Sequence, residues 1–301
     1  MPELPEVETL RRSIEPALVG RTIRAVEIRR RDMVSGPGDP VGGFSRAAGA
    51  PTPVRLAPTW LLEGLTIRGT ARRGKQLAIE AEQSTAGRTT GDPSGDAPAV
   101  VIQLGMTGSV SALDRNADLP AHTHVLWRLD NGRQIAFSDP RRFGLVRALP
   151  NGTRDAWADL GPDALTIRGK ALADRLVGTR RAIKAALLDQ QVLAGVGNIY
   201  ADESLFAARL HPEDPAGDIP PDRVALLATS VRRILRQAIE RGGSTIRDYR
   251  DGSGNAGAYQ RSHRVYGRTG LPCRSCGTPL AGLRVAQRAT VFCERCQPRN
   301  G

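Results

Sequence analysis

Pro2 and Glu3, at the start of the chain, could together carry out nucleophilic chemistry. The sequence opens Met1-Pro2-Glu3-Leu4-Pro5-Glu6-Val7-Glu8-Thr9. Removal of Met1, which a small second residue normally permits, would leave a secondary amine at Pro2. An α-amino group has a pKa of about 7.7 to 8, so a useful fraction is neutral and nucleophilic at cellular pH. Such an amine can attack a sugar C1′ or an aldehyde and form an iminium, with Glu3 as general acid or base. The structural alternative is that Pro2 and Pro5 only open a helix.

The cysteines have the spacing of a metal site. All of them lie near the end of the chain, as the pairs Cys273/Cys276 and Cys293/Cys296 with residues 277–292 between them. Two C-x-x-C pairs joined by a hairpin supply the four thiolates of a tetrahedral Zn²⁺ and leave no open coordination position. The sequence therefore predicts one structural zinc ion. The alternative of two disulfides is disfavoured in a reducing cytosol.

Composition favours a polyanionic partner. Among 301 residues, 43 are Lys or Arg and 31 are Asp or Glu, a net charge of +12. Such an excess suits nucleic acid, with a membrane surface as a weaker alternative. No segment approaches the roughly 20 apolar residues of a membrane span, and the first residues contain no apolar signal segment. We expect a soluble, unsecreted protein, cytoplasmic and associated with the nucleoid.

The first half of the chain reads as one helix followed mainly by strands. Apolar residues recur at helical spacing over residues 5–19, and we expect this helix to hold the amino terminus in place. Asn131-Gly132 between two strand-like runs predicts a hairpin. The expected strands cover residues 21–30, 65–71, 76–81, 100–103, 123–130 and 133–138. Residues 31–58 and 82–98 are rich in turn-forming residues and are expected to be loops.

The second half reads as helical. Helices are predicted over residues 182–190, 199–210 and 222–241. Gly195-Val196-Gly197-Asn198 is a tight turn before a helix N-terminus, where backbone N–H groups can hold a phosphate. This element is similar to a helix-turn-helix motif, and an ordinary helix hairpin is the alternative.

Five ordered blocks resemble the formamidopyrimidine-DNA glycosylase family, over nearly the whole chain. The blocks are the opening Pro2–Thr9, Leu104–Gly108, Asp139–Gly144, Gly195–Ala201 and the cysteine module with Ala286–Thr290. The resemblance implies an α+β, multidomain fold. Its parts are an N-terminal β-sandwich domain with an N-terminal helix (1–150), a helical domain with a helix-two-turn-helix and a lesion lid (151–260), and a terminal zinc-finger β-hairpin (261–301).

The resemblance also implies catalytic roles. In this family the N-terminal proline, here Pro2, attacks C1′ of the damaged nucleotide, the base leaves, and the iminium drives β and δ eliminations. Glu3 would protonate the sugar ring oxygen and then shuttle protons. Lys75 matches the family's essential lysine, and an ordinary surface cation is its alternative.

Further residues match the family's DNA contacts. Met106, Arg141 and Phe143 would fill the gap that base flipping leaves, although by composition alone Met106 and Phe143 would be core residues. Asn198 and Arg288 would hold the phosphates that flank the lesion, with zinc orienting Arg288. Gln103 stands where many relatives have a DNA-contacting His, and it can donate a hydrogen bond without carrying charge.

Residues 244–260 match the family's mobile lid over the flipped base. The lid candidates are Ser244, Arg247, Tyr249 and Tyr259. Backbone groups would read the base here, so side-chain identity carries little information. Glu203 matches a family acid, for which a buried structural role is the alternative. His122 and His124 are expected to be structural.

The sequence therefore predicts a monomeric, bifunctional DNA glycosylase and AP lyase that acts on oxidised purines in damaged double-stranded DNA. One alternative is an enzyme of the endonuclease VIII type, which prefers oxidised pyrimidines. Another is a non-catalytic damage-binding protein, which retention of Met1 would produce because the amide nitrogen of Pro2 would not be nucleophilic. An RNA-binding role is weaker, since aromatic residues make up only 4% of the chain.

Overall fold

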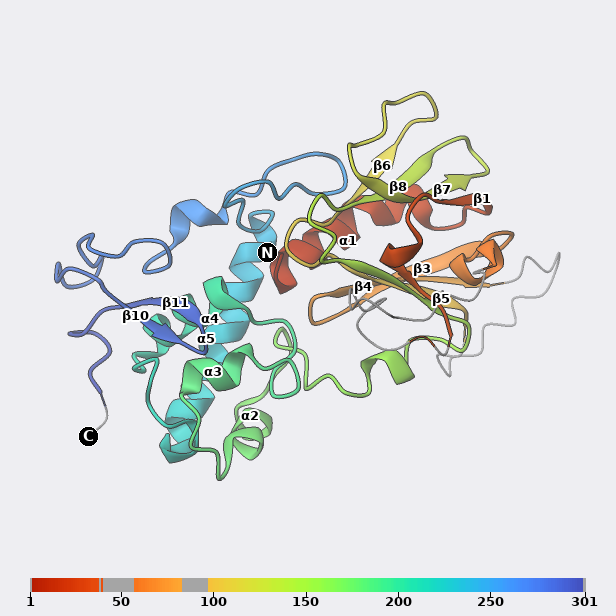
Figure 1. Ribbon diagram of the computed structural model, residues 1–301. Coiled ribbons are helices and arrows are strands. Elements are labelled where there is room, and N and C mark those ends of the chain that lie inside the picture. The colour runs from red at the N-terminus through yellow and green to blue at the C-terminus, as the bar shows by residue number, and fades with distance from the viewer. Residues whose placement is uncertain (1, 38, 40–56, 83–96, 300–301) are drawn as a thin grey trace. The chain divides into compact units, whose positions relative to one another are not determined.

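The computed structural model describes residues 2–37, 39, 57–82 and 97–299, and the chain divides into two compact units (Figure 1). The first unit comprises residues 1–2, 6–158 and 245–257. The second comprises residues 3–5, 159–244 and 258–301. Most of the loop predicted over 31–58, and nearly all of the loop predicted over 82–98, lie outside the described residues.

The first unit contains two sheets and most of helix α1 (Leu4–Leu18). The first sheet has the order β1-β7-β8-β6. Its strands are all antiparallel: β1 (Ile23–Ile28), β6 (Ser109–Leu113), β7 (Thr123–Leu129) and β8 (Gln134–Ser138). Asn131 and Gly132 form the predicted turn between β7 and β8, with Gly132 at φ 82°.

The second sheet has the order β2-β9-β5-β4-β3. Its strands are β2 (Val34–Ser35), β3 (Thr66–Arg73), β4 (Gln76–Glu82), β5 (Ala99–Gln103) and β9 (Leu145–Leu149). Only the β2–β9 pair among these is parallel. Two short 3-10 helices, η1 (Arg31–Met33) and η2 (Pro58–Leu61), flank the undescribed part of the long loop, and η3 (Asp155–Trp157) follows β9.

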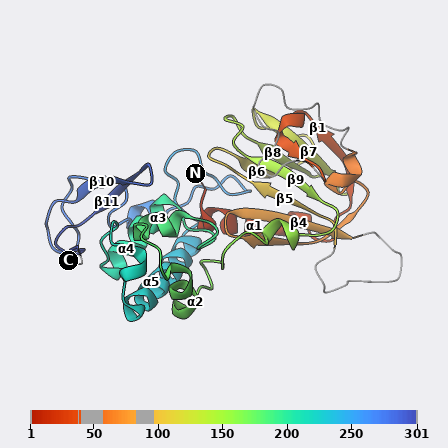
Figure 2. The same ribbon diagram turned by 60° about the horizontal axis from the view of Figure 1, so that its bottom comes forward.

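Both sheets and helix α1 share one core, which makes this unit a β-sandwich (Figure 2). The helix contributes Val7, Leu10, Ile14 and Leu18, the apolar face that the spacing predicts. Trp127 in β7 is 1% exposed and donates its indole N–H to the carbonyl of Leu61. Burial of an aromatic ring with its one donor satisfied anchors η2 on the sandwich.

Strands β2, β6 and β9 were not predicted from sequence. Each has two to five residues, too few to establish an alternation of apolar and polar side chains. They form strands because they pair with segments far away in the sequence: β6 pairs with β8, β9 pairs with β5, and β2 pairs with β9. Residues 34–35 thus form a strand inside the segment predicted to be loop.

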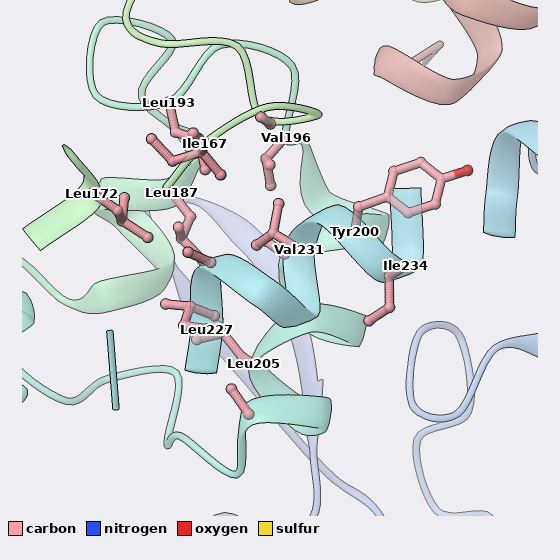
Figure 3. Packing of buried hydrophobic residues seen from close by; sticks show 14 of the residues in the cluster. Ile167, Leu172, Leu187, Leu193, Val196, Tyr200, Leu205, Leu227, Val231 and Ile234 are labelled. Carbon is pink, nitrogen blue, oxygen red and sulfur yellow. The ribbon is translucent and has the colours of Figure 1, made fainter. Parts of the chain in front are cut away.

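The second unit is helical, with a β-hairpin at its end. Its helices are α2 (Gly169–Leu176), α3 (Ile183–Leu188), α4 (Asn198–Ala208) and α5 (Pro221–Glu240), with 3-10 helices η4 (Ala216–Asp218) and η5 (Tyr259–Ser262). Helix α2 was missed because eight residues rich in small and charged side chains give a weak periodic signal. Figure 3 shows side chains of α4 and α5, including Tyr200, Val231 and Ile234, in the core of this unit.

Strands β10 (Ala281–Val285) and β11 (Arg288–Phe292) form the terminal hairpin. Ala286 and Gln287 both have positive φ, at 47° and 60°, as a two-residue type I′ turn requires. Within the described ranges, no helix combines the length and apolar composition of a membrane span.

Candidate active site and metal centre

Glu3 is fixed by the N-terminal end of helix α4. Its carboxylate accepts hydrogen bonds from the backbone N–H groups of Gly197 at 2.7 Å, Ile199 at 2.9 Å and Tyr200 at 3.4 Å. The residue is 2% exposed. An ionised carboxylate only accepts hydrogen bonds, and the partial positive charge of a helix N-terminus stabilises it. Glu3 is thus held as an acceptor with a defined orientation.

The turn before α4 is shaped to admit this carboxylate. A Cβ atom at position 197 would lie 2.4 Å from Cδ of Glu3, far inside van der Waals contact. The backbone N–H of Leu4 also donates to the carbonyl of Gly195 at 3.1 Å. The glycine turn, expected from sequence to hold a phosphate, therefore binds the carboxylate of Glu3 in this structure.

Pro2 lies two residues before the start of helix α1, and Lys75 lies in the turn between β3 and β4. The turn is tied to α1 through Arg72, whose Nε lies 3.1 Å from Oε2 of Glu8 and whose Nη1 donates to the carbonyl of Gly74. Burial would raise the pKa of Glu8, but hydrogen bonds from Arg11 and Arg12 outweigh it and hold the pKa below its usual value. An ionised Glu8 thus stabilises the turn that carries Lys75.

Met106 and Phe143 are surface residues, which rules out the core alternative for both. Met106 is 39% exposed and Phe143 is 42% exposed. The guanidinium of Arg141 lies 4.5 Å from the centroid of the Phe143 ring, in cation–π contact. The first unit thus displays two apolar side chains and a cation on neighbouring loops. Gln103, the last residue of β5, is exposed next to the Met106 loop.

Asp139 joins these two loops and was not recognised from sequence as a functional residue. It is fully buried. Its Oδ2 accepts from the N–H groups of Phe143 and Gly144, both at 2.7 Å, and its Oδ1 accepts from the Thr107 hydroxyl and the Arg141 N–H. An Asp before a Pro and a Gly was the available signal, because Asp side chains often bind backbone N–H groups of turns.

The close approach of these loops also depends on Gly105. This residue has φ 63°, and a Cβ there would lie 2.5 Å from the carbonyl carbon of Phe143. His124 supports the same region with a 2.8 Å contact from Nε2 to the carbonyl of Asp139. That contact and its 3% exposure give His124 the structural role expected of it. His122 is exposed, at φ 60°.

Asn198 and Arg288 lie on neighbouring elements of the second unit. Asn198 opens α4 and donates from Nδ2 to the carbonyl of Ala289 at 3.0 Å. Arg288 precedes Ala289 on β11 and is exposed. The side chain of Asn198 therefore contacts the residue that follows Arg288 on the hairpin.

A buried ion pair holds the hairpin against α4, and sequence reasoning missed it. Nζ of Lys184 lies 2.6 Å from Oδ1 of Asp202 and donates to Thr290 Oγ1 at 2.7 Å and to the carbonyl of Ala289 at 3.0 Å. Asp202 also accepts from the N–H of Val291. Burial lowers the pKa of Lys184 and raises that of Asp202, and the attraction between the two charges opposes both shifts.

The lid candidates do not act as one group in this structure. Ser244 and Tyr259 are buried in the second unit, where the Ser244 hydroxyl lies 3.2 Å from the Tyr200 hydroxyl and 3.0 Å from Nε2 of His263. Arg247 is exposed, and Tyr249 donates from its hydroxyl to the carbonyl of Glu6 at 3.0 Å. In this conformation the hydroxyl of Tyr249 and the ring of Tyr259 contact the protein itself, and their role in covering a base stays a prediction.

Glu203 is buried and has a structural role in this unit. Its carboxylate accepts 2.9 Å hydrogen bonds from the N–H groups of Arg264, Val265 and Tyr266. It is 2% exposed, and burial raises its pKa despite these bonds. Glu203 thus fixes the segment that leads into the cysteine module.

The four cysteines form a zinc site. Their sulfur atoms all lie within 4.8 Å of one another, with 4.0 Å between Cys273 and Cys296 and 3.5 Å between Cys276 and Cys293. A tetrahedral zinc with bonds of about 2.3 Å separates its sulfur ligands by about 3.8 Å, whereas a disulfide needs about 2.05 Å. The geometry fits one structural Zn²⁺ and excludes the disulfide alternative.

Three family models match the chain in order. The formamidopyrimidine-DNA glycosylase N-terminal domain matches residues 1–146, the formamidopyrimidine-DNA glycosylase H2TH domain matches residues 160–250, and the zinc finger found in FPG and IleRS matches residues 270–299. The last match agrees with the zinc geometry.

Curated relatives and solved structures agree with these matches. The formamidopyrimidine-DNA glycosylase of Symbiobacterium thermophilum is 40% identical over 99% of this chain and 90% of that protein. The MutM (Fpg) structure from Thermus thermophilus is 36% identical, with a TM-score of 0.79 and full coverage of both chains. A Lactococcus lactis FPG mutant in complex with Fapy-dG containing DNA is 32% identical, with a TM-score of 0.81, covering 99% of this chain and all of that one. The chain belongs to the formamidopyrimidine-DNA glycosylase family of DNA-repair enzymes, which are bifunctional DNA glycosylases and AP lyases.

Proposed function

We propose that this glycosylase removes oxidised purines, 8-oxoguanine and formamidopyrimidines, from duplex DNA with the amine of Pro2 as nucleophile. The observation that carries the proposal is the position of Pro2, which is bonded to a Glu3 whose carboxylate three backbone N–H groups hold in place. A nucleophile next to an oriented acid–base group is the arrangement that covalent base removal requires.

The proposed reaction runs in balanced steps. The Pro2 nitrogen forms a bond to C1′ as the bond from C1′ to the base breaks, and the departing base takes a proton from water. The carboxylate of Glu3 removes the N–H proton from the attached Pro2 nitrogen and delivers it to the sugar ring oxygen, the ring opens, and an iminium forms between Pro2 and C1′. Loss of a C2′ proton then expels the 3′ phosphate, and a second elimination expels the 5′ phosphate. Hydrolysis of the iminium regenerates Pro2.

Lys75 is proposed to act beside the damaged nucleotide. Its turn is fixed to α1 through the Arg72–Glu8 pair, and α1 begins two residues after Pro2. Asn198 and Arg288 are proposed to bind the phosphates that flank the lesion. One zinc-loaded copy of the chain is sufficient in this scheme, and it would act where chromosomal DNA lies, in the cytoplasm.

The preference for purines rests on the exposed residues of the first unit. Met106, Arg141 and Phe143 form the full gap-filling set of the purine-specific branch, and Met106 and Phe143 are solvent-exposed apolar side chains. A complex of MutM with carbocyclic 8-oxo-G containing DNA has a TM-score of 0.80 at 31% identity, covering 99% of this chain. Residues 244–260 are proposed to contact the flipped base mainly through backbone groups.

The experiment that tests this function compares single-turnover excision on three duplexes. They carry 8-oxoguanine opposite cytosine, an oxidised pyrimidine, or no damage. We expect fastest excision of 8-oxoguanine and none from undamaged DNA, with loss of excision in Pro2→Gly while DNA affinity is retained. Faster excision of the pyrimidine would assign the chain to the endonuclease VIII type, and damage-selective binding without excision would make it a damage-binding protein.

A further inference from the structure

The second unit contains a cavity of about 440 Å³ that neither the proposed chemistry nor the proposed DNA contacts use. Its walls come from the C-terminal part of α4, the second half of α5, the segment around η5 and the cysteine module. All of its lining residues belong to the second unit. Ligand pockets in proteins have volumes of about 300 to 1,000 Å³, so this cavity is of ligand size.

Four arginines line the cavity: Arg209, Arg233, Arg241 and Arg264. Each is exposed, and none forms an ion pair with a carboxylate anywhere in the part of the chain that the structure describes. Arg241 donates to the hydroxyl of Ser262, and Arg264 donates to that of Ser275 at 3.0 Å. A hydroxyl group orients a guanidinium group but does not neutralise its charge. Many other arginines of this chain are instead paired with the carboxylate of an Asp or Glu.

Negative charge near the cavity does not cancel this set. A zinc ion with four thiolates has a formal charge of −2, and Cys296 contributes to the wall. Arg264 lies next to that cluster, through Ser275 between the first two cysteines. Glu203 is the acidic lining residue. Its oxygens accept from the backbone of the 264–266 segment, and its charge also interacts with the guanidinium of Arg264. The helical side of the cavity therefore has three arginines without a carboxylate partner among the described residues: Arg209, Arg233 and Arg241.

The floor is apolar and aromatic. Phe206, Ile234 and Tyr259 line it with exposures of 8%, 5% and 4%. Burial and the nearby Glu203 carboxylate raise the pKa of Tyr259 to about 12, against the opposing effect of the nearby Arg233 and Arg241. The cavity thus combines guanidinium groups at its rim with an apolar base, which suits a ligand that has both an anionic group and a flat or apolar part.

We propose that this cavity is a second ligand site, which binds a phosphate ester of nucleotide size, with guanidinium groups on the phosphate and the apolar floor under the base. A phosphate offers several oxygens to converging guanidinium groups, and a nucleobase stacks on aromatic rings or guanidinium planes. The phosphate could belong to a free nucleotide or to the end of a nucleic-acid strand. A continuous duplex is disfavoured because its convex backbone does not enter a cavity of this size.

The site is separate from the phosphate contacts proposed at Asn198. Asn198 opens α4, whereas Phe206 lies eight residues later, about 12 Å along the helix axis. Arg288 likewise lies at the turn end of the hairpin and does not line the cavity. Binding at the cavity therefore does not require the residues assigned to the damaged strand.

The test uses calorimetric titration of the zinc-loaded full chain with pyrophosphate, dGMP, deoxyguanosine and a short 5′-phosphorylated single strand. The informative variant is Arg209→Gln/Arg233→Gln, because neither side chain donates a hydrogen bond or forms an ion pair within the described residues. Arg168→Gln/Arg180→Gln is the matched control, since it removes two exposed arginines of the same unit that do not line the cavity.

We expect dGMP to bind more tightly than pyrophosphate, and deoxyguanosine not to bind. The cavity variant should weaken dGMP by about tenfold or more, with the control variant equal to the parent. If only the phosphorylated strand binds, and the cavity variant alone loses it, the ligand is a strand end. Equal binding by the cavity and control variants would overturn the proposal, and so would binding of none of the phosphate probes. Circular dichroism and zinc content of each variant separate a lost site from a lost fold.

Discussion

The carboxylate of Glu3 occupies the space that a side chain at Gly197 would take. The N–H of Gly197 donates to Oε2 of Glu3 at 2.7 Å, and a Cβ at 197 would lie 2.4 Å from Cδ of Glu3. Position 197 has φ −126° and ψ −159°, which any residue can adopt. Glycine is therefore needed here for the approach of Glu3 and not for the backbone conformation.

Gly197→Ala should displace Glu3 with little effect on the fold. Because a shift of about 1 Å in a catalytic group can cost about 100-fold in rate, we expect a loss of that order in the single-turnover excision rate. Zinc content and affinity for damaged duplex should stay near the parent values. Gly69→Ala is the control, since position 69 in β3 has no atom within 4 Å of an added Cβ. An excision rate equal to that of the parent would show that the position of Glu3 is not critical.

Asp139→Asn should loosen the loop that displays Arg141 and Phe143. An amide in place of the carboxylate turns an NH₂ group toward backbone N–H donors that now bind Oδ1 or Oδ2. Each buried donor left unsatisfied costs about 1 to 3 kcal/mol. We expect a lower free energy of unfolding in urea and a smaller fluorescence change from 2-aminopurine placed next to the lesion, which reports unstacking of the duplex.

The exposed Asp118, for which the described residues show no hydrogen bond, provides the control variant Asp118→Asn. A normal 2-aminopurine signal in Asp139→Asn would mean that Asp139 stabilises the unit without positioning the gap-filling residues.

Lys184→Met should be strongly destabilising, because it leaves Asp202 buried without its counter-ion. Removing one partner of a buried pair costs about 3 to 5 kcal/mol. The double variant Lys184→Met/Asp202→Leu should recover much of that loss, since it leaves no unpaired charge. Urea denaturation of the two single variants and the double variant measures the coupling. A strictly additive result would show that the 2.6 Å contact contributes no interaction energy.

His263 should make stability depend on pH below neutrality. Burial lowers its pKa to about 4, from an ordinary value of about 6.5. The unfolded chain then binds a proton that the folded chain excludes, so stability is complete above about pH 6.5 and falls as the pH drops toward 4. His263→Phe keeps a ring between Tyr259 and Tyr266 and cannot be protonated.

We expect the difference in unfolding free energy between parent and His263→Phe to change over about pH 6.5 to 4, with the parent losing more stability as the pH falls. Comparing the two proteins cancels contributions that they share, including acid release of zinc and the lowered pKa of His211. A difference that does not vary with pH would contradict the assignment of a neutral, buried His263.

The sequence predicted those elements whose structure depends on residues close together in the chain. The apolar spacing of α1, the Asn131-Gly132 turn and the cysteine spacing each involve residues close together in the chain, and the structure or the family comparisons confirm them. The sequence blocks that resemble the family were also identified. The contacts between residues of different blocks could not be predicted. Which side chains meet depends on packing between segments far apart in sequence.

The residues that were not recognised from the sequence each make a contact over a long sequence separation. Asp139 reaches Thr107 across 32 positions, and Lys184 reaches Thr290 across 106. Neither pair has a spacing that a helix or hairpin would indicate. The burial of Ser244 and Tyr259 could not be predicted for a related reason, because it depends on contacts with Tyr200 and His263, and the role of these residues in a lid stays a prediction.

The most direct test of Pro2 as the nucleophile is borohydride reduction during reaction with a duplex that carries 8-oxoguanine opposite cytosine, followed by peptide mass mapping. We expect a covalent adduct on Pro2 as the first residue of the mature chain, none with undamaged duplex, and none in Pro2→Gly. An adduct on Lys75 or another lysine would contradict the assignment of the nucleophile. Excision without any trapped adduct, in protein whose intact mass shows that Met1 is removed, would contradict the iminium mechanism itself.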